Sequence, residues 1–311
     1  MIKEANMRRA FIGITFGIAL VTPLRCHAQA APTVPAPQMI VNDGDAIFVP
    51  VSHLRQDLLQ PRIGNGSTAD PSQWPATVVM LAGGMGKCTG TFVGPEVLLT
   101  AAHCVGQGAK AIVVDWETTG VCHRQSDWLF GVNMSPDWAL CRMKPVSRSG
   151  LFFERLNLND DAVKVGARLM LAGFGCVDLD RENWKEENPP VLRVGSAIVE
   201  RLPNLDASWA NWIVTVPATH GGASFVCPGD SGGAVYRQSA SGVRSIIGVV
   251  SAVGADKDKP DYKASYVSAL STPALKAFVT KWHQDQSVAP STSPAICGMT
   301  VDATRCRPNP P

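Results

Sequence analysis

A short stretch of glycines around one serine limits the fold of this chain more than any other feature. Residues 227–233 read Cys-Pro-Gly-Asp-Ser-Gly-Gly and place Ser231 among three glycines. Glycine adopts backbone conformations that are closed to residues with a β-carbon. A backbone bent in this way can aim two N–H groups at one point and leave the serine hydroxyl exposed, which acyl transfer requires. Glycines around a serine also occur in inert turns, so this stretch needs support from elsewhere in the chain.

Two further motifs give that support. Residues 98–104 read Leu-Leu-Thr-Ala-Ala-His-Cys and contain His103, and residues 135–140 read Ser-Pro-Asp-Trp-Ala-Leu and contain Asp137. Imidazole titrates near neutrality, so a histidine can take a proton from a serine and later return it to a leaving group. An aspartate can hold that imidazole in one tautomer and stabilise its charged form. The chain order is therefore histidine, aspartate, serine, which is one of the known orders for these three groups.

With all three motifs in this order, the sequence resembles the chymotrypsin-like (trypsin-family) serine endopeptidases over about residues 63–284. The resemblance implies that Ser231 is the nucleophile, His103 the general base and Asp137 the residue that orients the histidine. It also implies an oxyanion hole made by the N–H groups of Gly229 and Ser231. One alternative is a catalytically silent relative that acts as a binding module, which the presence of all three residues disfavours. Another is a processing protease with few targets.

The rest of the chain predicts an all-β protein. Short apolar runs are separated by Gly, Pro, Asn and Asp, and their lengths suit strands. The resemblance sharpens this to two antiparallel β-barrels, at about residues 63–165 and 166–271, with the active site between them. A closing C-terminal helix is predicted over 272–285, because Thr272 can cap it, Pro273 suits its first position and apolar residues follow at helical spacing. The predicted strand runs are 76–81, 96–100, 111–114, 138–143, 168–172, 191–199, 212–216 and 245–251.

The first 30 residues predict a secretory signal peptide. Three basic residues precede an apolar run over 10–21, and Ala28-Gln29-Ala30 suits cleavage. A transmembrane anchor is the alternative, but the run is shorter than the roughly 20 residues that a bilayer requires. We therefore expect a secreted protein, extracellular or periplasmic, with no membrane contact in its mature form. The net charge of +2 and the lack of basic runs with aromatics give no reason to expect nucleic acid as a partner.

Residues 31–62 are predicted to be a propeptide. In the family, the junction of Arg62 and Ile63 looks like an activation site, where an activating protease would free the Ile63 amino group to pair with Asp230. A buried ion pair that forms only after cleavage acts as a switch. Family members usually carry valine where this chain has Gly64, so activity of the uncut chain stays an alternative, as does a leader without any switch.

The resemblance also implies which residues recognise a protein or peptide substrate. Phe225, six residues before the nucleophile, stands at the base of the family's specificity pocket, where an aspartate would attract Arg or Lys. Val253 narrows the pocket, and Ala264 holds another position that lacks an acid. We expect a shallow apolar pocket for small or aliphatic side chains, unless Phe225 turns into the barrel. Ser251 and Val253 resemble the strand edge that pairs with the substrate backbone.

Nine cysteines suit an oxidising compartment. Cys26 would be lost with the signal peptide. The family's spacing implies a bridge between Cys88 and Cys104, and the family fold suggests Cys176 as the partner of Cys227. Cys122 and Cys141 remain within the first barrel, and Cys297 and Cys306 can close a small loop in the tail. The Ser- and Pro-rich tail 286–311 lies beyond the family domain, and we expect it to be a surface appendage, with a docking or retention element as the alternative. A metal site is the competing interpretation, but no Cys-x-x-Cys or clustered histidine supports one, and no cofactor is expected. The four expected pairs are Cys88–Cys104, Cys122–Cys141, Cys176–Cys227 and Cys297–Cys306.

Overall fold

A computed structural model describes most of the chain from residue 63 onward. The described residues are 63–82, 87–113, 116–130, 132–147, 149–159, 163–175, 190–204, 210–218, 222–256, 259–286, 293–300 and 306. The expected signal peptide, propeptide and Cys176 lie outside them. Within these ranges, no helix has the length and apolar content needed to cross a membrane.

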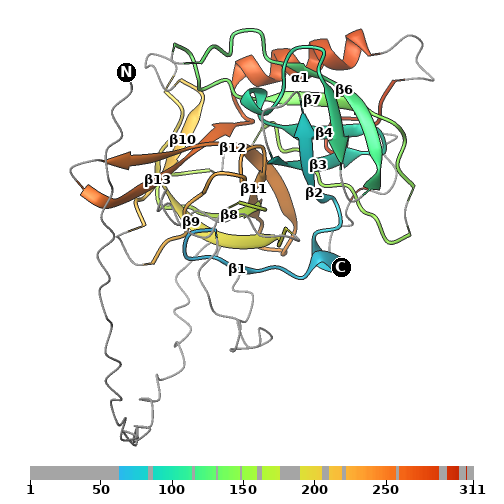
Figure 1. Ribbon diagram of the computed structural model, residues 1–311. Helices are drawn as coiled ribbons and strands as arrows, with labels where there is room; N and C mark the ends of the chain where they lie inside the picture. The colour runs from blue at the N-terminus through green and yellow to red at the C-terminus, as the bar shows by residue number, and fades with distance from the viewer. Residues whose placement is uncertain are drawn as a thin grey trace, which may run out of the picture. The chain divides into compact units, whose positions relative to one another are not determined.

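Six strands form a closed first barrel, in the order β2-β3-β4-β7-β6-β5 (Figure 1). Every neighbouring pair is antiparallel. β5 alternates exposed and buried residues, whereas seven of the eight residues of β3 are buried, since β3 runs through the core. The strands are β2 (Thr77–Ala82), β3 (Lys87–Gly94), β4 (Val97–Thr100), β5 (Lys110–Val113), β6 (Thr118–Arg124) and β7 (Ala139–Met143).

A second antiparallel barrel follows, in the order β9-β10-β13-β12-β11-β8, and the pairing of β8 with β9 closes it. The all-β prediction of two antiparallel barrels with a C-terminal helix is therefore confirmed. The short strand β1 (Ser67–Thr68) pairs with β9, so the first described strand joins this barrel rather than the first barrel. The strands are β8 (Arg168–Gly173), β9 (Arg193–Arg201), β10 (Trp212–Thr215), β11 (Ala234–Gln238), β12 (Arg244–Asp256) and β13 (Lys259–Ala269).

The helix α1 (Pro273–Asp285) packs against the core that contains the first barrel. Thr272 caps the helix by accepting a hydrogen bond from the Leu275 N–H at 3.4 Å, and Pro273 takes the first position. Leu275, Val279 and Trp282 are its buried residues and belong to the same core cluster as the strands β2 to β4. The spacing that predicted the helix is therefore also the spacing that buries it.

Part of the tail packs more tightly than its composition suggests. Ile296 and Cys297 are fully buried in the core cluster of the first barrel. The Cys297 N–H donates to the Val93 carbonyl at 2.8 Å, and the Leu156 N–H donates to the Cys297 carbonyl at 2.9 Å. These backbone bonds hold the segment against the end of β3. Residues 293–300 thus differ from the expected surface appendage, because backbone pairing leaves no trace in a Ser- and Pro-rich composition.

Candidate active site

His103 and Asp137 come together between β4 and β7. The chain leaves β4 at Thr100 and turns through a short 3₁₀ helix, Ala102–Cys104, which carries His103. Asp137 stands two residues before β7, which pairs with β4. Asp137 Oδ1 accepts the backbone N–H of His103 at 2.8 Å, and Oδ2 lies 2.7 Å from the ring Nδ1. The pairing of the two strands therefore delivers the two side chains that the motifs placed 34 positions apart.

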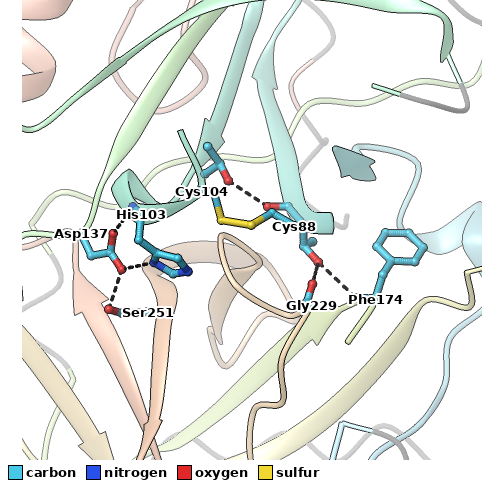
Figure 2. The surroundings of a disulfide bond; sticks show 9 residues. Cys88, His103, Cys104, Asp137, Phe174, Gly229 and Ser251 are labelled. Carbon is cyan, nitrogen blue, oxygen red and sulfur yellow. Dashed lines mark hydrogen bonds and ion pairs between the residues drawn. A yellow bond between two sulfur atoms is a disulfide. The ribbon is translucent and has the colours of Figure 1, made fainter. Parts of the chain in front are cut away.

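A hydroxyl from the second barrel completes the surroundings of this carboxylate. Ser251 on β12 donates its Oγ–H to Asp137 Oδ2 at 2.7 Å, and Figure 2 shows Asp137 receiving bonds from both His103 and Ser251. The Asp137 side chain is 2% exposed, whereas that of His103 is 28% exposed. The carboxylate is thus fixed inside the protein while the ring keeps an open side.

The charge of Asp137 changes the titration of His103. Burial of the ring opposes its charged form, but the hydrogen bond to Asp137 and the negative charge of its carboxylate outweigh burial. Together they raise the pKa of His103 above its ordinary value. The imidazole is therefore a stronger base than a free histidine, which suits a group that takes a proton from a hydroxyl.

The loop around Ser231 has the tight backbone that its glycines predicted. Gly229 has φ +98° and Gly232 has φ +82°, which are left-handed conformations that side chains disfavour. A β-carbon at Gly232 would collide with the Thr100 hydroxyl and the Thr89 carbonyl, so only glycine fits there. The Ser231 carbonyl accepts the Thr89 N–H at 2.8 Å, which binds the loop to β3 of the first barrel.

The N–H groups of Gly229 and Ser231 have no acceptor among the residues that the structure describes. Their neighbours are bonded, since the Asp230 N–H donates to the Cys227 carbonyl and the Gly232 N–H to the Val250 carbonyl, both at 2.9 Å. Two unused donors on either side of Asp230 are what an oxyanion hole needs. Over the same described ranges, no hydrogen bond joins the Ser231 hydroxyl to His103. Such bonds are often long in unliganded enzymes and tighten with substrate.

Asp230 is fully buried behind this loop. Its Oδ1 accepts the Gly175 N–H at 2.7 Å and its Oδ2 accepts the Cys227 N–H at 2.9 Å. Burial raises the pKa of Asp230 to about 7, against the opposing effects of these two hydrogen bonds and the charges of Arg193 and Lys87. No ion pair between Ile63 and Asp230 occurs within the described residues of this uncut chain.

Ile63 is already docked in the second barrel. Its side chain is 1% exposed and belongs to the core cluster that contains Leu171 and Val235. The backbone is held nearby, since the Ser224 hydroxyl donates to the Asn65 carbonyl at 3.0 Å. Ile63 has φ +42°, which is unusual for a β-branched residue. Cleavage before Ile63 would remove this torsion, because φ exists only while the preceding carbonyl is attached.

The three residues predicted for the specificity pocket have different surroundings. Phe225 is 7% exposed, and its ring packs directly on Gly64, with Lys263 Nζ lying 5.2 Å from the ring centre. Ala264 is fully buried and lies opposite Gly254 in the β12–β13 ladder, while Val253 is half-buried. The Phe225 ring thus lies against Gly64, near the start of the described residues, and belongs to neither core cluster of the described chain.

Beside the candidate nucleophile, one edge of β12 has no partner strand among the described residues. β11 pairs with β12 from Arg244 to Val249, and Val250 exchanges bonds with Gly232 and Gly233. From Ser251 to Val253, β12 pairs with β13 alone in the part of the chain that is described. The family resemblance predicts that this edge binds the substrate backbone.

The family comparison fits this geometry. The trypsin family model matches residues 63–271, which is more than half of the chain. The chain belongs to the trypsin family. It is also similar to serine protease SP24D of Anopheles gambiae, with 25% identity over 201 residues that make up 60% of this chain and 72% of that protein.

Three disulfides occur among the described residues of this trypsin-family chain. They join Cys88 to Cys104, Cys122 to Cys141 and Cys297 to Cys306. Cys227 is also disulfide-bonded, whereas its expected partner Cys176 lies outside the described residues. Cys88, His103 and Cys104 bring three metal-ligating atoms within 4.8 Å of one another, but the disulfide uses both sulfurs. That group therefore offers a metal no thiolate while the bond is intact.

Two contacts in the site were not anticipated from the sequence. The motifs assigned Ser251 through its backbone, but its hydroxyl binds Asp137. Thr89, beside Cys88, was given no role, yet its hydroxyl donates to the Gly229 carbonyl at 2.9 Å. No signal in the sequence pointed to either contact, because each joins residues more than 100 positions apart.

Proposed function

We propose that this trypsin-family protein is a secreted serine endopeptidase that hydrolyses peptide bonds through an acyl-enzyme on Ser231. The observation that carries the proposal is the pair of hydrogen bonds between Asp137 and His103, at the backbone N–H and at ring Nδ1. This contact leaves the other ring nitrogen, Nε2, available as the base. The two unused N–H groups on either side of Asp230 add support.

The reaction follows from these positions. His103 Nε2 takes the Ser231 hydroxyl proton as Oγ attacks the carbonyl carbon of the scissile bond. The N–H groups of Gly229 and Ser231 donate to the oxygen that becomes negative. The imidazolium then gives its proton to the leaving amine, the C–N bond breaks and an ester remains on Ser231. Water, deprotonated by His103, releases the acid product and restores the serine.

Asp137 and Ser251 keep the base in position. The Asp137 carboxylate fixes the Nδ1–H tautomer and stabilises the imidazolium that forms in each half-reaction. The Ser251 hydroxyl donates a second hydrogen bond to Oδ2. This bond holds the orientation of the buried carboxylate.

Substrate binding is proposed along the open edge of β12. An extended peptide would pair with Ser251 and Val253 as an added strand, with its side chain directed at an apolar pocket near Val253 and Ala264. No acid stands at positions 225, 253 or 264, so we propose a preference for small or aliphatic side chains over Arg and Lys.

Secretion and activation complete the proposal. The basic and apolar pattern of residues 1–30 and the disulfides support export, to the extracellular space or the periplasm. Cleavage after Arg62 by an activating protease would free the Ile63 amino group for Asp230, whose buried carboxylate favours a cationic neighbour. N-terminal sequencing of the secreted protein tests this: Ile63 as first residue supports it, and a distant start with full activity contradicts it.

The test of the function is cleavage of a peptide library by the secreted protein, with Ser231→Ala as the control. We expect cleavage after small or aliphatic residues and none by the variant. Equal cleavage by the variant would overturn the role of Ser231, and a clear preference for Arg or Lys would overturn the pocket. A silent relative acting as a binding module would cleave nothing and still bind its partner.

A further inference from the structure

We propose that Thr89 is a positioning residue that holds the oxyanion loop in its working shape. This inference rests on the proposed function, since it concerns the N–H groups of Gly229 and Ser231. Thr89 lies on β3 of the first barrel, directly after Cys88, and is fully buried. It makes no contact with substrate in the proposed mechanism, so any effect on the reaction must pass through the loop.

One residue binds the carbonyls of both proposed oxyanion donors. The Thr89 backbone N–H donates to the Ser231 carbonyl at 2.8 Å, and its side-chain hydroxyl donates to the Gly229 carbonyl at 2.9 Å. The same hydroxyl accepts the Phe174 N–H at 3.1 Å. Figure 2 shows Gly229 and Phe174 near the Cys88–Cys104 disulfide, with dashed lines for the two hydroxyl bonds. The hydroxyl thus donates one hydrogen bond and accepts another.

Gly229 needs such an anchor more than other residues do. It has φ +98° and no side chain, so little in its own structure stops its peptide groups from rotating. A β-carbon at Gly229 would lie 3.0 Å from the Gly175 Cα, so a side chain that would restrict this backbone fits poorly there. Fixing the Gly229 carbonyl on one side and the Ser231 carbonyl on the other limits rotation of the two residues that supply the N–H donors.

Thr89 also links the oxyanion loop to the general base. Its own carbonyl accepts the Thr100 hydroxyl at 3.0 Å. Cys88, the residue before it, forms the disulfide with Cys104, the residue after His103. The base and the oxyanion donors are therefore held from adjacent positions of one strand, so their separation changes little when substrate arrives.

Removing the hydroxyl would take away the partner of the buried Phe174 N–H and that of the Gly229 carbonyl, which is half-buried. Such groups are costly inside a protein, so the loop would shift to find other partners. A shifted loop misplaces donors that matter mainly when the carbonyl oxygen becomes negative. The substitution should therefore lower kcat and leave KM nearly unchanged. Loss of a threonine with a purely structural role would not change kcat selectively.

The experiment compares the wild-type protein with three variants. Thr89→Val keeps the shape and removes both hydroxyl bonds, and Thr89→Ser keeps the hydroxyl. Thr118→Val is the matched control, because Thr118 is a buried threonine of the same barrel whose hydroxyl binds the Lys144 carbonyl. For each protein, kcat and KM are measured on a peptide substrate, together with the inhibition constant of a peptide boronic acid, which forms a tetrahedral adduct with a serine hydroxyl.

We expect Thr89→Val to lower kcat by about 10- to 100-fold. This decrease should not exceed the decrease in kcat that follows removal of one oxyanion donor. KM should change by less than about twofold, and the boronic acid should bind weaker by a factor close to that in kcat. Thr89→Ser should recover kcat to within about threefold, and Thr118→Val should match the wild type. A Thr89→Val protein with wild-type kcat, or a loss that serine does not rescue, would overturn the proposal.

Two further results keep the outcome clear. If Thr89→Val does not fold, the Phe174 amide of the wild-type protein is measured by hydrogen exchange: slow exchange supports its bond to Thr89, and fast exchange contradicts it. A wild-type protein that neither cleaves peptides nor binds the boronic acid would refute the proposed function itself. An active wild type with an unaffected Thr89→Val variant would refute only the role of Thr89.

Discussion

The phenyl ring of Phe225 occupies the space that a β-carbon on residue 64 would need. A backbone hydrogen bond also joins the two residues: the Phe225 N–H donates to the Gly64 carbonyl at 3.0 Å. Glycine at position 64 and phenylalanine at position 225 are therefore complementary. The departure of Gly64 from the family's usual valine is explained by the ring that fills the place of the missing side chain.

Replacing Gly64 with valine should destabilise the protein, because the new side chain and the Phe225 ring compete for one space. We expect Gly64→Val to lower the free energy of unfolding by about 1–3 kcal/mol. Phe225→Ala should also destabilise, by leaving a cavity. The double variant should lose less than the sum of the two single variants, measured by denaturant unfolding. Strict additivity would show that the two side chains do not compete.

The Ser251 hydroxyl should contribute to the rate and not to substrate binding. Ser251→Ala removes the bond to Asp137 Oδ2 and keeps the backbone of β12. A hydrogen bond to a charged group stabilises by about 1.5–3 kcal/mol, so we expect kcat to fall on the order of tenfold or more with little change in KM. Steady-state kinetics of Ser251→Ala tests this prediction. The control is Ser196→Ala, because Ser196 is an exposed serine of β9. A rise in KM alone would assign Ser251 only to substrate pairing.

The pH dependence of the reaction should report on His103. The base must be neutral, so kcat/KM should rise with pH through an inflection above 6.5, the ordinary pKa of histidine, because Asp137 raises the pKa of His103. Asp137→Asn removes the hydrogen bond and the charge that raise the pKa of His103, whereas burial of the ring still lowers this pKa. The inflection should therefore move to lower pH, and the rate should fall about 10⁴-fold. NMR titration of the ring protons measures the same pKa directly. An inflection at the same pH in the wild type and in Asp137→Asn would contradict the role of Asp137.

Asp230 should make the uncut protein less stable as the pH rises. Burial raises the pKa of Asp230 to about 7 in the folded chain, against about 3.8 for the free carboxyl. Between these values the unfolded chain is ionised while the folded chain holds the proton, so this group's contribution to stability is full below about pH 3.8 and is lost towards pH 7. Thermal unfolding should show a flatter pH dependence for Asp230→Asn. Both proteins would carry Arg62→Gln to prevent cleavage, and parallel curves would contradict the prediction.

Much of the fold could be predicted because its signals are local. Apolar runs bounded by turn residues predicted strands that both barrels contain, and the Thr272 cap with its spacing predicted α1. The histidine and aspartate motifs predicted a pair that the structure brings within 2.7 Å. Each of these features needs only a few neighbouring residues and a known motif order.

The remaining features depend on contacts between distant parts of the chain. Thr89 and Gly229 are 140 positions apart, and Ser251 and Asp137 are 114 apart. The orientation of the Phe225 ring depends on Gly64, and the burial of Cys297 depends on backbone bonds to β3 and to Leu156. No local pattern encodes such pairs, because either residue alone would suit many surroundings.

Covalent labelling tests the central claim most directly. The mature wild-type protein is treated with a fluorophosphonate, which reacts with a serine only where a base activates it and oxyanion donors stand beside it, and the modified residue is identified by peptide mass spectrometry. We predict stoichiometric modification of Ser231 and its loss in His103→Ala, with Ser196 and the other serines unmodified. A correctly folded, processed protein that stays unlabelled at Ser231 would contradict the account.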